Sequence, residues 1–206
     1  MNNPSDINVV PSSVRRRSRA LVFAGGLLAL VQAPAPTRIV HFDAPATLPD
    51  RSQPADCRPS AAAGFRTDAF ACTAGAKDYD PCFETARSGT LLCDVDPRVA
   101  SSGTLVKWTP PEAAPSDTRG PVTRAWFFEL PDGTTCRPVT GDRREIAGLT
   151  EIYTCRFALP GEADAVLGEL DASTPVWTIQ QVLINKKVEP PTIKSLLAAP
   201  VKTVWR

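Results

Sequence analysis

Histidine is almost absent from this chain: His41 is the one histidine among 206 residues. Histidine supplies most general bases and belongs to the Ser-His-Asp and Cys-His groups of many hydrolases. His41 lies between Val40 and Phe42 in a proline-rich stretch, and we interpret it as a surface or edge-strand residue. The sequence therefore argues against those hydrolases and against histidine-rich metal sites, and it predicts a protein that is not an enzyme.

The chain also lacks an excess of either charge. Lysine and arginine total 23 against 22 aspartate and glutamate residues, a net charge of +1. Residues 1–33 hold four of the arginines and one aspartate, so the remainder carries 19 basic and 21 acidic side chains, a net charge of −2. This balance leaves no basic stripe for nucleic acid and no polybasic patch for lipid headgroups. We therefore expect no nucleic-acid partner.

Long hydrophobic runs are missing too. The apolar run at residues 20–31 has 12 residues, whereas a membrane-spanning helix needs about 20. It follows the basic segment at residues 15–19 and precedes small residues at 32–35, which is the order of an export signal. We predict a signal peptide over residues 1–33, cleaved near residues 33–35. The alternative is an uncleaved N-terminal anchor, in which residues 20–31 would make the membrane contact.

Cysteine, by contrast, occurs six times, at Cys57, Cys72, Cys82, Cys93, Cys136 and Cys155. An even count behind an export signal predicts a disulfide framework and an extracytoplasmic, secreted protein. A zinc site or a redox motif would need CxxC spacing, which the sequence lacks. Nearness in sequence favours the pairs 57–72, 82–93 and 136–155, each contributing roughly 3 kcal/mol through loop closure. Rival sets, such as 57–93 with 72–82, stay open.

Proline fills 21 positions and argues against long helices, because it has no amide proton and fixes φ. Residues 34–56 are read as a proline-rich linker with a short edge strand at 38–42. A second proline-rich segment, residues 109–121, is read as a surface loop. We assign residues 57–206 to a single disulfide-bonded β domain.

Short alternating segments predict that this domain is built of strands. Residues 122–130 and 134–139 flank Pro131-Asp132-Gly133, a sequence typical of a hairpin turn. Further strands are predicted at residues 90–95, 103–108, 150–157, 176–184 and 201–205. Helix signals are limited to residues 161–170 and to helix starts at Asp80-Pro81 and Asp96-Pro97. The fold class predicted is all-β, a sandwich or open barrel with short helical caps, held by disulfides.

The candidate chemical site is a group of four aspartates, Asp78, Asp80, Asp94 and Asp96. They lie in near mirror-image segments, DYDPC and CDVDP, on either side of the favoured 82–93 pair. Four carboxylates brought together there could bind Ca²⁺ and stabilise the domain, or serve a carboxylate-based hydrolase of unfamiliar type. The simpler interpretation is that aspartate before proline starts a turn or caps a helix without an ion. No other cofactor is expected.

Two other groups of side chains that could bind a ligand also have simpler explanations. Acidic neighbours largely neutralise the arginines near Cys136 and Cys155, so we interpret these arginines as a solvated face of ion pairs. They are Arg137, Arg143, Arg144 and Arg156. Tryptophans at strand ends can bind glycans or peptides, but such residues more often belong to the core. They are Trp108, Trp126, Trp177 and Trp205.

Residues 69–97 contain an aromatic-x-Cys element, then Asp-Pro-Cys-Phe, then a leucine-rich strand that ends in cysteine. This arrangement resembles a group of uncharacterised exported bacterial proteins of the actinobacterial type. Weaker similarities continue at residues 129–136, 153–155, 175–178 and 204–205. The resemblance implies a secreted, disulfide-bonded domain and supplies no activity or catalytic residues. We therefore expect an extracytoplasmic, non-catalytic binding or structural module of the bacterial envelope, with a protein or glycan as its partner.

Overall fold

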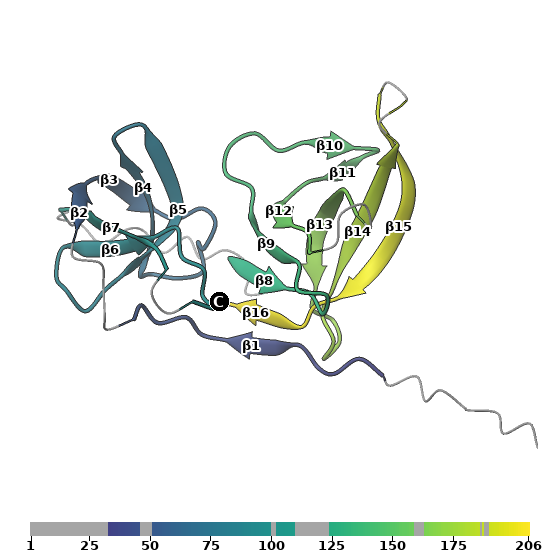
Figure 1. Cartoon of the computed structure of the whole chain (residues 1–206), viewed down its shortest axis with the longest axis horizontal. Helices are drawn as coiled ribbons and strands as arrows, with labels where there is room; N and C mark the ends of the chain where they lie inside the picture. Colours follow the sequence, from purple (N-terminus) through teal and green to yellow (C-terminus); the bar gives the residue numbers. More distant parts are fainter. Residues whose placement is uncertain are drawn as a thin grey trace, which may run out of the picture. The chain divides into compact units, whose positions relative to one another are not determined.

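The computed structural model describes residues 33–45, 51–99, 102–109, 124–158, 163–185, 187 and 190–206. The chain divides into two units, Met1–Ala33 and Pro34–Arg206, and all the strands belong to the second. The described residues form two large sheets and one small hairpin, with no helix among them (Figure 1). The all-β, disulfide-bonded part of the predicted fold class is therefore confirmed. The predicted signal at residues 1–33 lies almost wholly outside the described residues.

The first sheet has six strands, all from the N-terminal half of the described chain. Their order across the sheet is β2 (Ser52–Pro54), β7 (Thr104–Lys107), β6 (Thr90–Cys93), β5 (Lys77–Glu84), β4 (Ala69–Ala74) and β3 (Asp56–Pro59). The β2–β7 pair is parallel, and the other four pairs are antiparallel. Gly75, with φ of 61°, makes the tight turn between β4 and β5.

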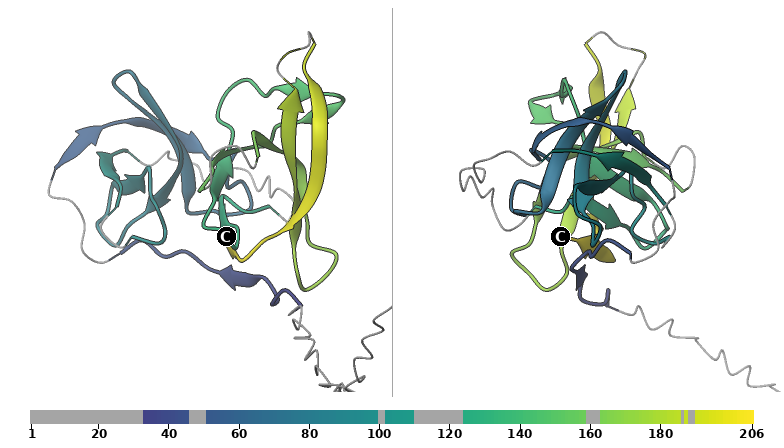
Figure 2. Two further views of the ribbon diagram at one scale, coloured as in Figure 1. Left: turned by 45° about the vertical axis from the view of Figure 1, so that its right-hand side comes forward. Right: turned by 90° about the vertical axis from the view of Figure 1, so that its left-hand side faces the viewer.

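The second sheet has eight strands. Their order is β1 (Arg38–Val40), β16 (Thr203–Trp205), β8 (Phe127–Glu129), β9 (Thr135–Pro138), β12 (Tyr153–Arg156), β13 (Ala165–Asp171), β14 (Thr178–Asn185) and β15 (Thr192–Pro200). Strand β1 pairs parallel to β16, which confirms the predicted edge strand near residues 38–42. The small hairpin joins β10 (Glu145–Ile146) to β11 (Leu149–Thr150). Both large sheets curl in the manner of half-barrels (Figure 2).

The hairpin between β8 and β9 forms at the predicted turn. The Leu130 N–H donates to the Thr134 carbonyl at 2.9 Å, which closes the loop. The Asp132 carboxylate accepts hydrogen bonds from the amide and the hydroxyl of Thr134, at 2.8 and 2.9 Å. Gly133 has φ of 89°, a backbone conformation that is unfavourable for any residue that carries a Cβ atom. Local turn chemistry therefore fixes the register of β8 against β9.

The three disulfides are Cys57–Cys72, Cys82–Cys93 and Cys136–Cys155. This is the pairing that nearness in sequence favours, and the rival sets are not formed. Each disulfide joins residues that stand directly opposite each other on neighbouring antiparallel strands, with Cα atoms 4.1 Å apart. Each therefore reinforces one strand pair, and none crosses from one large sheet to the other.

The predicted helical caps are wrong for the described residues. Residues 165–171 form strand β13 instead, because Val166 packs into one hydrophobic cluster and Leu167 into another. A strand buried on both faces is favoured where apolar residues follow one another directly. Asp80 and Pro81 lie inside β5, and Pro97 starts only a turn, which the Val99 N–H closes on the carbonyl before that proline.

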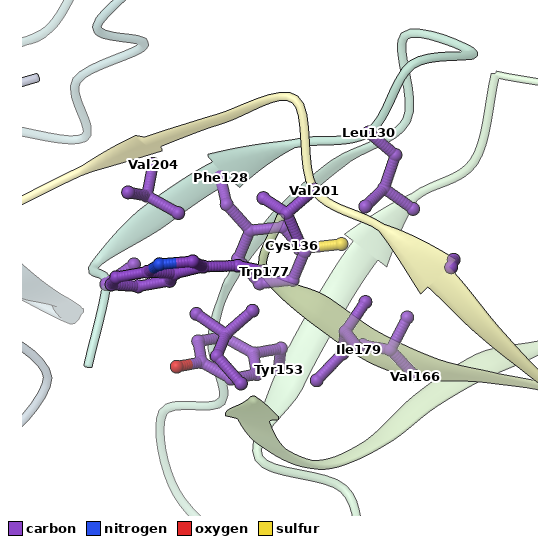
Figure 3. Close-up of a cluster of buried hydrophobic side chains, with 12 residues drawn as sticks. Phe128, Leu130, Cys136, Tyr153, Val166, Trp177, Ile179, Val201 and Val204 are labelled. Atoms are coloured by element: carbon purple, nitrogen blue, oxygen red, sulfur yellow. The ribbon is translucent and has the colours of Figure 1, made fainter. Parts of the chain in front are cut away.

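The two large sheets share one hydrophobic cluster. Its large aromatic and leucine side chains come from β5, β6, β7, β8 and β16 and from the chain beside β1 and β8, and they are Phe42, Phe83, Leu92, Leu105, Trp126, Phe127 and Trp205. We call this cluster the shared core. A second cluster lies within the eight-stranded sheet, around Phe128, Tyr153 and Trp177 (Figure 3). Three of the four tryptophans are thus buried, as expected for core residues.

No helix in the described part of the chain has the length and apolar character to cross a membrane. The apolar run at residues 20–31 lies outside that part. Strands β1 and β2 fall within residues 34–56, the stretch assigned to a linker, and residues 46–50 between them lie outside the described residues. The domain limits and the uncleaved-anchor alternative stay predictions.

Candidate functional site

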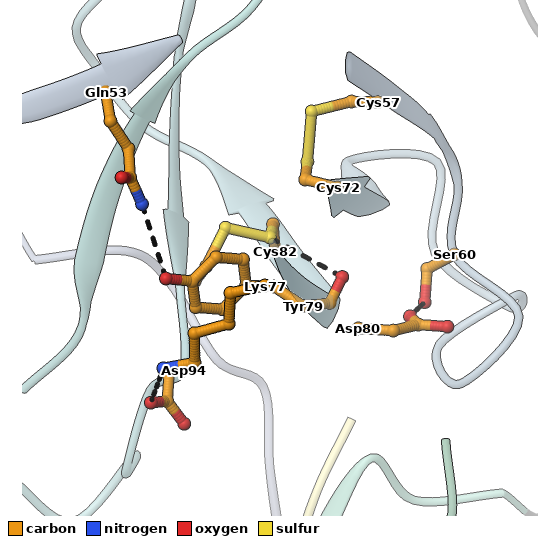
Figure 4. The surroundings of a disulfide bond; sticks show 10 residues. Gln53, Cys57, Ser60, Cys72, Lys77, Tyr79, Asp80, Cys82 and Asp94 are labelled. Atoms are coloured by element: carbon orange, nitrogen blue, oxygen red, sulfur yellow. Dashed lines mark hydrogen bonds and ion pairs between the residues drawn. A yellow bond between two sulfur atoms is a disulfide. The ribbon is translucent and has the colours of Figure 1, made fainter. Parts of the chain in front are cut away.

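Asp94 and Asp96 of the predicted calcium site each form ion pairs. Arg137 donates to Asp94 at 2.9 Å, and Lys77 lies 3.4 Å from its other carboxylate oxygen (Figure 4 shows the lysine). Burial alone would raise the pKa of Asp94, but these two cations outweigh it and hold the pKa below its ordinary value. The Arg98 guanidinium makes two hydrogen bonds to Asp96, at 2.6 and 2.9 Å, and lowers the pKa of that carboxyl too.

Asp78 and Asp80 form hydrogen bonds with neutral partners, unlike Asp94 and Asp96. Asp78 accepts a hydrogen bond from the Thr73 hydroxyl at 2.6 Å on the exposed side of β5. Asp80 accepts hydrogen bonds from the Ser60 hydroxyl, which Figure 4 shows, and from the Ala62 N–H. Burial raises the pKa of Asp80 more than these hydrogen bonds lower it.

The structure thus gives each of the four aspartates its own partners. Within the described residues, one group of three potential metal ligands lies within 4.8 Å, the sulfurs of Cys72, Cys82 and Cys93. All three sulfurs belong to disulfides and are not thiolates. The described carboxylates form no cluster of this kind. The calcium site therefore stays a prediction from the sequence.

His41 has the surface position that its sequence context indicates. Its side chain is 70% exposed, and its Nε2 atom lies 3.7 Å from the Asp43 carboxylate. An imidazole on the surface that faces another exposed side chain is solvated on most sides. The described residues around His41 therefore do not form a catalytic group with it.

A polar pocket of about 440 Å³ lies between side chains of the two large sheets in the described structure. One wall comes from the six-stranded sheet and presents Arg58, Asp78 and Asp80. The other wall comes from the chain before β8, the loop after β9, and β12, and its polar residues are Arg124, Thr140, Arg143 and Tyr153. Sites for small ligands commonly have volumes of about 300–1,000 Å³. We call this site the arginine pocket.

The arginine pocket has a basic wall around the phenol of Tyr153. Burial raises the pKa of Tyr153 to about 12, and the negative charge of Glu169 adds to this effect. The nearby charges of Arg124 and Arg143 act in the opposite direction, so both guanidiniums lie within electrostatic reach of the phenol. Arg124 donates to Glu169 at 2.9 Å, and its Nε atom is buried without a hydrogen-bond partner among the described residues. This wall therefore combines a neutral hydroxyl with two cations.

The sequence indicates only part of this arrangement. It grouped Arg143 with Arg144, and Arg144 does form an ion pair with Glu151, at 2.5 and 2.8 Å. Arg143 instead lines the arginine pocket with Arg58 and Arg124. No spacing or periodicity connects these three positions, because strands distant in sequence bring them together.

Tyr153 gives a pH-dependent prediction. Its pKa of about 12 lies above the ordinary value of 10, so the folded state favours the neutral phenol. This contribution is fully present below pH 10 and is lost as the pH rises through 12, at a cost of roughly 2–3 kcal/mol. Urea unfolding of the wild type and Tyr153→Phe should therefore diverge over that range, with the wild type losing more stability. Tyr79→Phe, which retains Tyr153, should follow the wild type; equal pH profiles for all three proteins would contradict the assignment.

Comparisons with protein-family models, with curated proteins and with solved structures gave no match to this chain. The resemblance to exported actinobacterial-type proteins therefore stays a prediction from the sequence.

Proposed function

We propose that this chain is an exported, non-catalytic binding module of a bacterial envelope and that the arginine pocket binds a carboxylate-bearing ligand. The observation that carries the proposal is the basic wall, where Arg124 and Arg143 line the pocket together with Tyr153 and their charges act on its phenol. Guanidinium groups pair with carboxylates through two parallel hydrogen bonds, and a neutral phenol can donate a third. Asp78 and Asp80 on the opposite wall can accept hydrogen bonds from hydroxyl or amine groups of the same ligand.

The chemistry of the pocket favours binding over catalysis. A general acid or base works best when its pKa lies near the operating pH. The pKa of about 12 keeps Tyr153 protonated near neutral pH, so the phenol suits hydrogen bonding better than proton transfer. Asp80 is already held by the Ser60 hydroxyl and by a backbone amide. These groups therefore have the properties of fixed recognition elements.

The cysteines support the proposed compartment. Three disulfides, with no free cysteine among the described residues, indicate an extracytoplasmic, oxidising environment. Export through a signal at residues 1–33 and residence at the envelope are the finer parts of this proposal. They rest on the order of charged, apolar and small residues at the N-terminus.

The proposal is tested by titrating the whole chain with two carboxylates, glucuronic acid and a dipeptide with a free C-terminus, and following binding by NMR. Glucose and the amidated dipeptide are the neutral counterparts and should bind at least about tenfold more weakly. The preferred carboxylate identifies the ligand as a sugar acid or as a peptide end. If neither carboxylate binds, the proposed ligand class is wrong.

Substitutions in and near the arginine pocket test whether the ligand binds there. Arg143→Gln should weaken carboxylate binding by about tenfold or more, since one charged hydrogen-bond donor is lost. Arg143→Lys should lose less, because it keeps the charge without the planar fork. Arg156→Gln is the matched control, an exposed arginine of β12 that does not line the pocket, and it should bind as the wild type does. Equal binding by both glutamine variants would exclude the arginine pocket as the site.

A further inference from the structure

One edge of strand β15 has no partner strand among the described residues. It has nine residues, pairs with β14 on one side and ends the eight-stranded sheet in the described residues (Figure 1). The other strands that end the two large sheets, β1, β2 and β3, have three, three and four residues. A row of unpaired backbone amides and carbonyls is a template for another strand. Strand β15 is therefore the edge on which strand addition would form the most hydrogen bonds.

The same edge exposes apolar side chains. Leu196 is 51% exposed and Leu197 is 66% exposed, two of the four large hydrophobic residues that are exposed in the described structure. They are neighbours at the centre of β15 rather than at its ends. Covering them would remove apolar surface from water at the place where the backbone is unpaired.

Two features limit the part of β15 that can accept a strand. The register against β14 shifts at Lys194, because Leu183 faces Ser195 while the next residue of β14 faces Ile193. Such a bulge bends the strand, and a charged lysine further protects the edge. At the other end Pro200 has no amide proton to donate. The usable edge is Ser195–Ala199. Leu197 is its centre and lies three residues from both Lys194 and Pro200.

We propose that a second copy of this chain covers the edge, with the two β15 strands pairing antiparallel about a two-fold axis at Leu197. In this register Leu197 faces Leu197 of the second copy, and Ser195 faces Ala199 of the second copy. Lys194 falls opposite Pro200 of the second copy, so pairing ends at the same point on both strands. Because Leu197 lies midway between Lys194 and Pro200, a two-fold axis there keeps both residues out of the paired segment on each strand.

Charge is compatible with this pairing. Lys194 is the one charged residue of β15. In the proposed register the two lysines lie about 20 Å apart along the strands. That separation is about twice the screening length of roughly 10 Å at ordinary ionic strength, so their repulsion is small. A register centred nearer the start of β15 would bring the lysines together.

Sedimentation velocity of the whole chain over a range of concentrations tests the proposal. The wild type should shift from monomer to dimer as concentration rises. Leu197→Lys and Leu197→Glu should each weaken association by about tenfold or more, because like charges would meet on the axis. An equimolar mixture of the two variants should associate again, since lysine then faces glutamate. Ile39→Lys is the matched control, a lysine at an exposed apolar residue of edge strand β1, and it should dimerise as the wild type does.

The outcomes separate cleanly. A wild type that stays monomeric at every concentration overturns the proposal and leaves the edge to a different protein. A dimer that both Leu197 variants retain excludes β15 as the interface. A mixture that fails to associate places the axis elsewhere than Leu197. The proposal does not depend on the arginine pocket, and loss of ligand binding would not affect it.

Discussion

Trp126→Ala is expected to lower the free energy of unfolding by about 3–5 kcal/mol, the range found when a buried tryptophan is truncated. Trp126 is 2% exposed, and its ring centroid lies 4.7 Å from Phe83, 5.2 Å from Phe42 and 5.9 Å from Phe127. Phe83 belongs to β5 and Phe127 to β8, so the indole touches both large sheets. A loss of this size is a large share of the roughly 5–15 kcal/mol that stabilises a typical domain.

Urea unfolding followed by circular dichroism measures this loss. Trp126→Phe should cost much less than Trp126→Ala, because it keeps an aromatic ring and removes a buried indole N–H that has no hydrogen-bond partner in the described part of the chain. Trp108→Ala provides a comparison at a half-buried tryptophan, which packs on Phe70 within the six-stranded sheet. If Trp126→Ala costs no more than Trp108→Ala, the shared core does not join the two sheets in the way described.

Removing the Cys82–Cys93 disulfide by a double change to alanine should cost about 3 kcal/mol from loop closure alone. The pair has a sequence separation of 11, and both cysteines are fully buried. The cavity left by the two sulfur atoms adds to that cost. We therefore expect the variant to unfold at a much lower urea concentration, or to remain unfolded near 37 °C.

The matched control removes Cys57–Cys72, which has a separation of 15 and a half-buried Cys57. Its loop-closure cost is similar. A greater loss in the free energy of unfolding on removing Cys82–Cys93 is therefore due to the deeper burial of that pair. Thiol titration of the unfolded wild type without reductant should detect no free thiol. Detection of two thiols would show that one of the three disulfides is absent.

Features set by neighbours in sequence were predictable. The β8–β9 hairpin follows from Pro131-Asp132-Gly133, where one side chain and one glycine satisfy the turn. The disulfide pairing follows from short loops, because each pair of cysteines flanks a single excursion of the chain. Both depend on interactions within about 20 residues, and such interactions leave a pattern in the sequence.

Features set by distant neighbours were not predictable. Residues 161–170 have apolar residues whose spacing suits a helix as well as a strand, and packing against two clusters selects β13 for residues 165–171. The arginine pocket is a further case. Arg58, Arg124 and Arg143 meet only after both sheets have formed, so no local signal marks them as one site.

The disulfides pair in chain order: first cysteine with second, third with fourth, fifth with sixth. A chain that enters an oxidising compartment N-terminus first presents both members of one pair before the next pair arrives. An oxidant that joins thiols as they emerge then makes each native bond directly. Reshuffling of wrong bonds, which takes seconds to hours, is unnecessary on this route. If the proposed export takes place, this order of pairing demands an oxidant for maturation but places little demand on a disulfide isomerase.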